Sequence, residues 1–252
     1  SKKLKKRNLF IAIKGKKLDG HNYVKESIFK GAASCVVSNK FNFDLSKKII
    51  KTKNTNEFLN KLAHLKRLSS EATIIGITGS SGKTSLKDLI GKLLSFFDKT
   101  YYSQKSFNNS YGVPLSLSNL ELDHKYGVFE IGMSKSGEID KLSKLVKPHI
   151  AVITNIAEAH IENFKDLKGI AKAKGEIINN IVKDGYLILN RDDNFFSYFK
   201  NEALKKNIKV VSFGLNKNSD IKALRIKKIN SINYLTVKVF NKIYNLNFEG
   251  HH

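Results

Sequence analysis

Residues 73–94 read TIIGITGSSGKTSLKDLIGKLL, and this stretch determines how the rest of the chain is organised. Its opening residues are β-branched or apolar, which is typical of a buried strand. A Gly-Ser turn then leads into apolar residues at helical spacing, namely Leu86, Leu89, Ile90, Leu93 and Leu94. The stretch therefore predicts a strand, a glycine-rich loop and a helix.

The predicted loop has the chemistry of a phosphate-binding turn. Gly79 and Gly82 let backbone N–H groups converge on an anion, and the next helix adds its free N-terminal donors. Lys83 is expected beside the β- and γ-phosphates, and Thr84 is expected to offer its hydroxyl to Mg²⁺. The residues predicted to bind ATP here are Gly79, Ser80, Ser81, Gly82, Lys83 and Thr84.

The spacing differs from the common P-loop pattern G-x-x-x-x-G-K-[ST]. Ile77 stands where the first glycine would be, so the loop reads T-G-x-x-G-K-T. The alternative interpretation is a tight strand-to-helix turn with an incidental lysine. The flanking strand and helix, which phosphate binding requires, favour the functional interpretation.

Composition narrows the class of protein. The chain has 252 residues, 41% hydrophobic, with no apolar run near the roughly 20 residues that cross a bilayer, so we expect no membrane insertion. The single cysteine, Cys35, is interpreted as a buried structural thiol. One cysteine cannot form a disulfide within the chain, which suits the cytoplasm. We also expect a monomer. The net charge of +23 suggests nucleic-acid binding as a hypothesis. The lysines, however, are spread along the chain and no RNA-binding aromatic motif is present, so we expect no nucleic-acid partner.

The N-terminal part predicts a small α/β domain over residues 1–70. Strands are expected at residues 9–13, 34–38 and 44–50, and helices at 23–31 and 55–70. The polar residues 69–73 mark the predicted boundary, and residues 71–252 form the predicted second domain.

That second domain continues the alternation of strands and helices. Strands are expected at residues 100–103, 126–131, 150–154, 186–189 and 210–213, and helices at 112–119, 138–146, 167–181 and 194–206. This order predicts a mainly parallel sheet with helices on both faces. Residues 221–226, 234–240 and 243–248 predict antiparallel strands at its edge.

Three polar residues end predicted parallel strands: Glu130, Asn155 and Asn190. Ligands of such sheets bind outside the carboxyl ends of the strands, so these residues are expected around the phosphate loop. Glu130 is a candidate Mg²⁺ ligand, with a solvent-facing strand end as the alternative. His160 follows a strand, and by spacing alone an ordinary histidine is the stronger interpretation.

Several motifs together resemble the Mur ligases in order and spacing. They are TGSSGKT at 78–84, SFNNSYGVPLSL at 106–117, FEIGMSKSGEI at 129–139, TNIAEAHIENF at 154–164 and AKAKGEI at 171–177. The stretch at 8–38 resembles the first domain of the type that joins D-Ala-D-Ala to UDP-N-acetylmuramoyl-tripeptide. The resemblance implies an ATP-dependent acid–amino-acid ligase of peptidoglycan precursor synthesis that forms an acyl phosphate.

The resemblance also implies roles for residues. Thr84 and Glu130 would serve one of two Mg²⁺ ions and His160 the second, while Lys174 matches the family's carbamylated lysine. Catalytic roles fall to Lys83, His160 and Lys174, and nucleotide contacts also to Asn155, Asn190 and Asp192. The substrate-binding residues implied are Ser1, Lys2, Asp19, Gly20, His21, Asn108 and Asn109. For Lys174 the alternative is a solvent-facing helical lysine, and for residues 19–21 a plain turn.

The sequence departs from the family pattern at both ends. Only Ser1-Lys2 stands for an Asp-Ser-Arg motif, and we expect the family's third domain to be absent after the edge strands. The ending EGHH reads either as the family's Gly-x-His segment or as a tag remnant. We expect a fragment that binds ATP without ligating. Alternatives are another Mur-type ligase, a folylpolyglutamate synthase-like enzyme, or a nucleotide-binding module without ligase chemistry.

Overall fold

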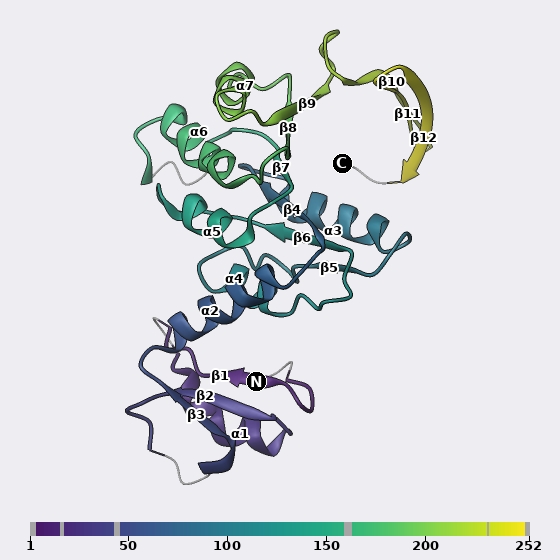
Figure 1. The fold of residues 1–252 in the computed structure, drawn as a ribbon. Coiled ribbons are helices and arrows are strands. Elements are labelled where there is room, and N and C mark those ends of the chain that lie inside the picture. The colour runs from purple at the N-terminus through teal and green to yellow at the C-terminus, as the bar shows by residue number, and fades with distance from the viewer. Residues whose placement is uncertain (1–3, 16–17, 43–45, 159–162, 231, 250–252) are drawn as a thin grey trace. The chain divides into compact units, whose positions relative to one another are not determined.

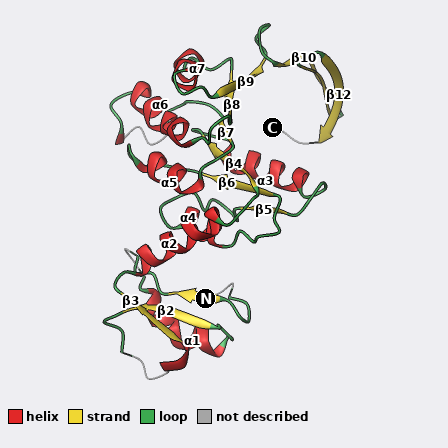
Figure 2. Ribbon diagram, viewed as in Figure 1, coloured by secondary structure: helices red, strands yellow, loops and turns green. Residues whose placement is uncertain are grey.

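The computed structural model describes residues 4–15, 18–42, 46–158, 163–230 and 232–249. The chain divides into two compact units, Ser1–Leu65 and Lys66–His252. The division lies inside the helix α2 (Thr55–Leu68), before the polar segment 69–73. Figures 1 and 2 show the elements of each unit.

The first unit is built on a three-stranded parallel sheet of order β1-β2-β3. Its strands are β1 (Leu9–Ile11), β2 (Ser34–Ser38) and β3 (Ile49–Thr52), and α1 (Val24–Phe29) connects the first two. Ala12, Val24, Ala32, Cys35 and Val37 form its buried core. The predicted strand at 44–50 is wrong in its start: residues 44–45 lie outside the described part, Ser46–Lys48 is a 3-10 turn, and β3 begins at Ile49.

The second unit contains a nine-stranded sheet of order β12-β11-β10-β9-β8-β7-β4-β6-β5. All neighbouring strands from β5 across the sheet to β10 pair in parallel. The last two pairs, β10 with β11 and β11 with β12, are antiparallel, as the sequence predicts. The bounds are β4 (Thr73–Thr78), β5 (Thr100–Tyr102), β6 (Tyr126–Glu130), β7 (Ile150–Ile153), β8 (Tyr186–Asn190), β9 (Lys209–Gly214), β10 (Ile221–Ile229), β11 (Ile232–Val239) and β12 (Lys242–Glu249).

Helices cover both faces of the parallel strands. On one face α3 (Lys83–Leu94) packs Leu86, Ile90 and Leu94 on the buried residues of β4, β6 and β7. The opposite face is so close to its cover that a side chain at Gly76 of β4 would meet Pro148, Ile131 and Ile177 at 3.2–3.5 Å. The other helices are α4 (Gly112–Ser118), α5 (Glu138–Val146), α6 (Leu167–Gly175) and α7 (Phe196–Leu204).

One predicted helix is interrupted. Instead of running over residues 167–181, α6 ends at Gly175 and continues as a 3-10 helix, Glu176–Asn180. The side chain of Glu176 accepts hydrogen bonds from the N–H groups of Gly137 and Asp140, 2.7 and 3.0 Å away, at the start of α5. The segment is therefore fixed by capping another helix, which its own periodicity does not reveal.

The connections place the phosphate loop at a topological switch point. From β4 the chain passes to β5 and returns through β6 on one side of β4, and it then crosses to β7 on the other side. In open parallel sheets the crevice at such a reversal is where ligands bind. None of the described helices is both long and apolar enough to cross a membrane.

Candidate active site

The loop between β4 and α3 has the backbone that phosphate binding needs. Gly79 has φ +143° and Gly82 has φ +77°, conformations that favour glycine. A Cβ at Gly79 would lie 1.9 Å from Thr154 Oγ1, whereas one at Gly82 would meet nothing within 4 Å. Gly79 is therefore required both for its backbone angle and for close packing, and Gly82 for its angle alone.

The segment after β7 holds this loop from the side. Asn155 accepts a hydrogen bond from the backbone N–H of Ser81 at 3.0 Å and donates to the Ser81 hydroxyl at 2.8 Å. Thr154 donates its hydroxyl to the Ser81 carbonyl at 2.6 Å, and the Ser80 N–H donates to the Asn155 carbonyl at 2.9 Å. Asn155 thus lies at the phosphate loop, where the sequence places it, and acts on the loop's shape.

Glu130, the last residue of β6, is only 1% exposed and joins two segments. One carboxylate oxygen accepts from the Thr84 hydroxyl and the other from the Asn108 amide, both at 2.7 Å. The ion pairs of the described residues do not include Glu130. A buried carboxylate beside a hydroxyl oxygen is a donor set that suits a hard cation such as Mg²⁺, so the residues present fit this metal.

Two lysines converge on one carbonyl of the phosphate loop. Lys83 donates to the Gly79 oxygen at 2.7 Å and to the Ser80 oxygen at 3.0 Å. Lys174, on α6 and only 2% exposed, donates to the same Gly79 oxygen at 2.9 Å. Burial lowers the pKa of Lys174 to about 8, with the charge of Lys83 contributing in the same direction. Burial also lowers the pKa of Lys83, and the charge of Glu130 opposes that shift.

The other predicted residues of this unit have internal roles in the structure. Asn109 accepts from the N–H groups of Tyr111 and Gly112 and so supports the start of α4. Asn190 accepts from the Asp192 N–H at 3.0 Å. The Asp192 carboxylate accepts from the N–H groups of Leu215 and Asn216 at 2.6 and 2.9 Å, so both oxygens are engaged in fixing the loop after β9.

In the first unit, Asp19 and His21 border a cavity of about 530 Å³. Asp19 accepts from the backbone N–H of His21 at 2.9 Å and faces its Nδ1 at 2.6 Å, and these two contacts, the backbone bond first, lower the pKa of Asp19. His21 Nε2 accepts from the Ser38 N–H at 3.0 Å, which leaves the proton of a neutral ring on Nδ1. A side chain at Gly20 would come within 2.6 Å of the Ile13 backbone, so Gly20 is needed for the turn itself.

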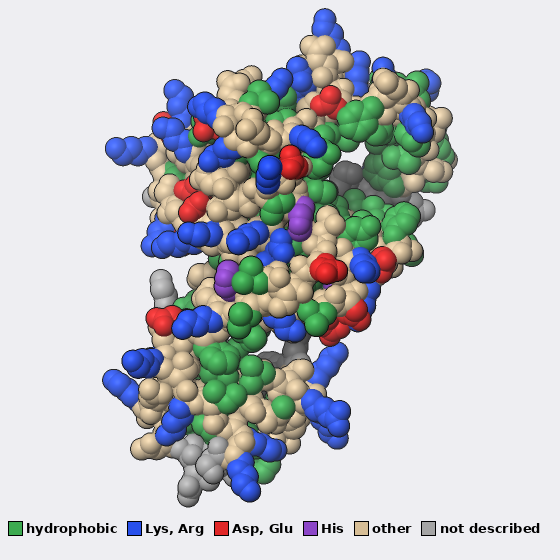
Figure 3. All heavy atoms as spheres, in the orientation of Figure 1, with side chains coloured by type: hydrophobic (Ala, Val, Ile, Leu, Met, Phe, Trp, Pro, Cys, Tyr) green, Lys and Arg blue, Asp and Glu red, His purple; other side chains and the backbone are tan. Residues whose placement is uncertain are grey.

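Lysines line that same cavity. Lys14, Lys40 and Lys53 lie at its wall with polar groups of Asn22 and Asn54. Elsewhere the Lys and Arg side chains are spread over the visible face of each unit, as Figure 3 shows.

Three residues predicted to belong to the site, Ser1, Lys2 and His160, lie outside the described residues.

The structure adds residues that the sequence analysis missed. Thr154 binds the phosphate loop directly. Asp193 accepts from the Ile156 N–H at 2.7 Å, which ties the segment after β7 to the turn after β8. Lys87, which lies on α3 about one turn after Thr84, is fully buried. Position at a strand end could have singled out Thr154, but no local signal marks Lys87.

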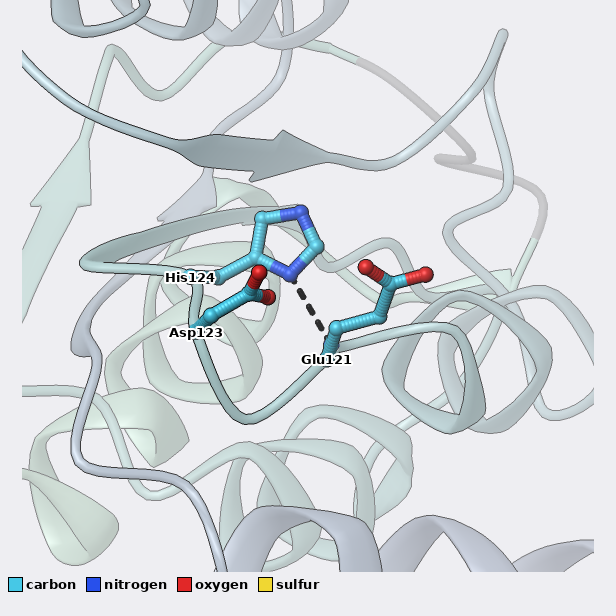
Figure 4. A group of neighbouring side chains, drawn as sticks. All are labelled: Glu121, Asp123 and His124. Atoms are coloured by element: carbon cyan, nitrogen blue, oxygen red, sulfur yellow. Dashed lines mark hydrogen bonds between the residues drawn. The ribbon is translucent and has the colours of Figure 1, made fainter.

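A second group of possible metal ligands lies away from the phosphate loop. Glu121, Asp123 and His124 lie close together on the loop before β6 (Figure 4). His124 Nδ1 accepts from the Glu121 N–H at 2.9 Å, and the Lys99 ammonium pairs with both carboxylates, at 3.0 and 2.5 Å. Because a lysine already supplies the positive charge, this group is a surface ion-pair cluster.

Comparison with known proteins identifies the family. The family model "Mur ligase middle domain" matches residues 77–252. The chain is 40% identical over 227 residues to the UDP-N-acetylmuramoyl-tripeptide–D-alanyl-D-alanine ligase of Rickettsia prowazekii, covering 89% of this chain and 50% of that protein. It therefore spans about half the length of this relative.

Solved structures agree. A crystal structure of MurF from Acinetobacter baumannii superposes with a TM-score of 0.86 at 30% identity, covering 100% of this chain and 54% of that one. The MurF ligase of Thermotoga maritima in complex with ADP gives 0.83 at 26% identity, covering 100% and 57%. With a mainly parallel sheet, a phosphate loop and a matching family model over residues 77–252, the chain belongs to the Mur ligase family.

Proposed function

We propose that the chain carries the ATP site and the nucleotide-substrate site of a ligase that joins D-Ala-D-Ala to UDP-N-acetylmuramoyl-tripeptide. The observation that carries this proposal is the arrangement at the phosphate loop, where Lys83 and Lys174 meet at the Gly79 oxygen and Glu130 faces Thr84. The names of the relatives and the ADP complex of one of them support it.

In the proposed reaction, the terminal carboxylate of the tripeptide attacks the γ-phosphate of ATP and forms an acyl phosphate with release of ADP. The amine of D-Ala-D-Ala then attacks the acyl carbon, and phosphate leaves. The ammonium of Lys83 leaves the Gly79 and Ser80 carbonyls and stabilises charge on the transferred phosphoryl oxygens. The two Mg²⁺ ions expected here would neutralise phosphate charge, one of them held by Thr84 and Glu130 and the other by His160.

Lys174 is proposed to carry a carbamate. The neutral amine attacks CO₂, a nitrogen–carbon bond forms, one proton leaves to solvent, and the ammonium is replaced by an anion. A pKa of about 8 makes the neutral amine accessible near neutral pH, and burial removes the modified group from water. Carbamylation would also end the repulsion between the Lys83 and Lys174 ammonium groups and supply an anion to support Mg²⁺.

The first unit is proposed to hold the uridine-nucleotide end of the substrate. Its cavity combines three lysines, which attract a diphosphate, with the amides of Asn22 and Asn54. The Asp19–His21 pair fixes the turn at the cavity wall. In the second unit, Asn190 and Asp192 are proposed near the adenosine, and Asn108 and Asn109 near the muramoyl end.

Titration calorimetry with ATP and Mg²⁺ tests the central claim. We expect the chain to bind ATP with Mg²⁺, and UDP-N-acetylmuramic acid independently of ATP. An ATPase without ligase chemistry would instead respond to nucleic acid and not to the muramoyl nucleotide. The expectation that these 252 residues bind ATP without completing ligation stays a prediction, and an assay with ATP, Mg²⁺, UDP-muramoyl-tripeptide and D-Ala-D-Ala decides it.

A further inference from the structure

Lys87 is a buried cation that the proposed reaction does not use. It lies on α3, one turn after Lys83, and is 0% exposed. Its ammonium donates to the Lys105 carbonyl at 2.7 Å and pairs with Asp88 at 2.9 Å. Burying an ammonium is unfavourable unless its partners compensate for the lost hydration. The contact with Lys105 is therefore the feature to explain.

The Lys105 carbonyl lies near the start of a loop over residues 104–111. The backbone bonds from the Phe107 N–H to the Gln104 carbonyl at 3.3 Å and from the Asn108 N–H to the Ser106 carbonyl at 2.8 Å lie within this loop, whereas the bond from Lys87 ties it to α3. Lys105 has φ +48°, a left-handed conformation that is unfavourable for residues other than glycine. The side chain of Lys105 is exposed, so packing of that side chain does not hold the conformation. The charge-assisted bond from Lys87 holds the carbonyl in place instead.

The same loop delivers Asn108 to Glu130. The Asn108 amide donates to the carboxylate at 2.7 Å, and the Asn108 carbonyl accepts from the Gly132 N–H at 2.8 Å. Gly132 leaves so little room that a Cβ there would lie 2.9 Å from the Asn108 side chain. Asn108 therefore reaches Glu130 only when the loop keeps its path.

These contacts close a ring. Thr84 on α3 donates to one oxygen of Glu130, and Asn108 donates to the other. The loop that carries Asn108 also contains Lys105, whose carbonyl accepts from Lys87 on α3, one turn after Thr84. We propose that Lys87 is a positioning residue that fixes the loop 104–111, so that Asn108 orients the Glu130 carboxylate toward the phosphate loop. This inference rests on the proposed function in assigning Mg²⁺ to Glu130.

The ion pair with Asp88 offers a simpler role, stabilisation of α3 alone. Asp88 is the next residue on the same helix and is 43% exposed, and it makes no contact that reaches the loop among the described hydrogen bonds. Asp88→Asn removes that ion pair and leaves the Lys87–Lys105 bond intact. It is therefore the matched control for Lys87→Met, which removes both contacts at similar volume.

Hydrogen exchange on the whole chain tests the loop directly. In Lys87→Met we expect exchange of the amides in residues 104–111 to rise about tenfold, because a charge-assisted bond that holds them is lost. The Asp88→Asn variant should keep wild-type exchange there. Equal exchange in Lys87→Met and wild type overturns the inference, whatever the chain binds.

Nucleotide binding provides the second readout. We expect Lys87→Met to weaken ATP binding in the presence of Mg²⁺ about tenfold while changing ATP binding in EDTA less than about twofold, which a general loss of structure would not do. If Lys87→Met does not fold, Asn108→Ala must give the same Mg²⁺-specific loss, and its absence overturns the inference. Wild-type chain that binds no ATP with Mg²⁺ contradicts the proposed function, while the exchange data still judge the loop.

Discussion

The ammonium groups of Lys83 and Lys174 donate to the same acceptor, the Gly79 carbonyl, at 2.7 and 2.9 Å. Burial of Lys174 disfavours its charged form, and repulsion from the Lys83 ammonium at the same neutral oxygen adds to that penalty, which lowers the pKa of Lys174 to about 8. The site is thus arranged so that removing one positive charge relieves strain. Nucleotide binding can draw Lys83 away, and modification can neutralise Lys174.

Replacing Lys174 by Met should stabilise the unmodified chain at pH 7. The folded-state pKa of Lys174 is about 8 against 10.5 in the unfolded chain, so the unfolded state binds more protons between these values. The penalty from Lys174 is fully present below pH 8 and disappears as the pH rises to about 10.5. Denaturant unfolding in CO₂-free buffer should therefore show a variant-minus-wild-type difference that shrinks over this range. A difference that does not change with pH contradicts the assignment.

Carbamylation of Lys174 should be visible in ¹³C NMR spectra of the wild-type chain with ¹³C-bicarbonate near pH 8. The Lys174→Met variant is the control for signals from other amines. We expect a carbamate resonance that the variant lacks. A bare ammonium at Lys174 with ATP and Mg²⁺ bound would count against the proposed role.

Lys83→Ala should weaken ATP binding about tenfold or more. The substitution removes a charge-assisted contact of about 1.5–3 kcal/mol to the phosphates. Titration calorimetry measures the change, with the exposed Lys92→Ala on the same helix as the control. Equal ATP affinity in Lys83→Ala and wild type would rule out the phosphate-loop assignment.

Alanine at the two loop glycines should have unequal effects. Gly82→Ala meets open space and carries only the backbone penalty of φ +77°, about 1–2 kcal/mol. Gly79→Ala would also collide with Thr154, whose hydroxyl binds Ser81. We expect a larger fall in melting temperature and loss of ATP binding only for Gly79→Ala, and equal effects would contradict the described packing.

The cavity of the first unit should bind UDP-N-acetylmuramic acid through its lysines. Lys53→Ala removes one cation from the cavity wall and should weaken binding about tenfold, again from a charge-assisted contact of about 1.5–3 kcal/mol. Lys61→Ala, on the same unit but outside the cavity, should leave binding unchanged. Calorimetry on the whole chain checks both, and equal affinities of both variants would move the site elsewhere.

His149 should make the chain less stable in mild acid. Its Nδ1 accepts from the Ile74 N–H at 2.8 Å, and burial, followed by the charge of Arg67, lowers its pKa. A lowered folded-state pKa means that the unfolded chain takes up the proton first, so stability from this group is present above pH 6.5 and is lost as the pH falls below it. Unfolding free energies of His149→Asn should vary less between pH 7 and 5 than those of wild type and of the exposed His64→Asn control.

Local sequence determined the elements of this protein and the strand ends that carry much of its site. The helix α5 and the strand β2 lie where their sequence patterns predict them, because α5 buries one apolar face and β2 is a short apolar run buried on both faces. Glu130 and Asn155 lie at the phosphate loop because parallel strands bring their carboxyl ends together. Site residues that lie at the end of a strand could therefore be predicted from the sequence.

Tertiary structure alone decided the rest. Lys174 is 95 positions from Gly79 in the chain, and helical spacing does not distinguish it from the exposed lysines of a lysine-rich protein. The motif at 171–177 marked it, but only the fold buries it and brings it to the phosphate loop. Lys87 carries no local signal and Asp192 is assigned to the nucleotide only by the family resemblance, yet the first is buried and bonded to the Lys105 carbonyl and the second binds the backbone after β9. Burial and partners of a polar group depend on which distant segment covers it, and only the folded chain fixes that.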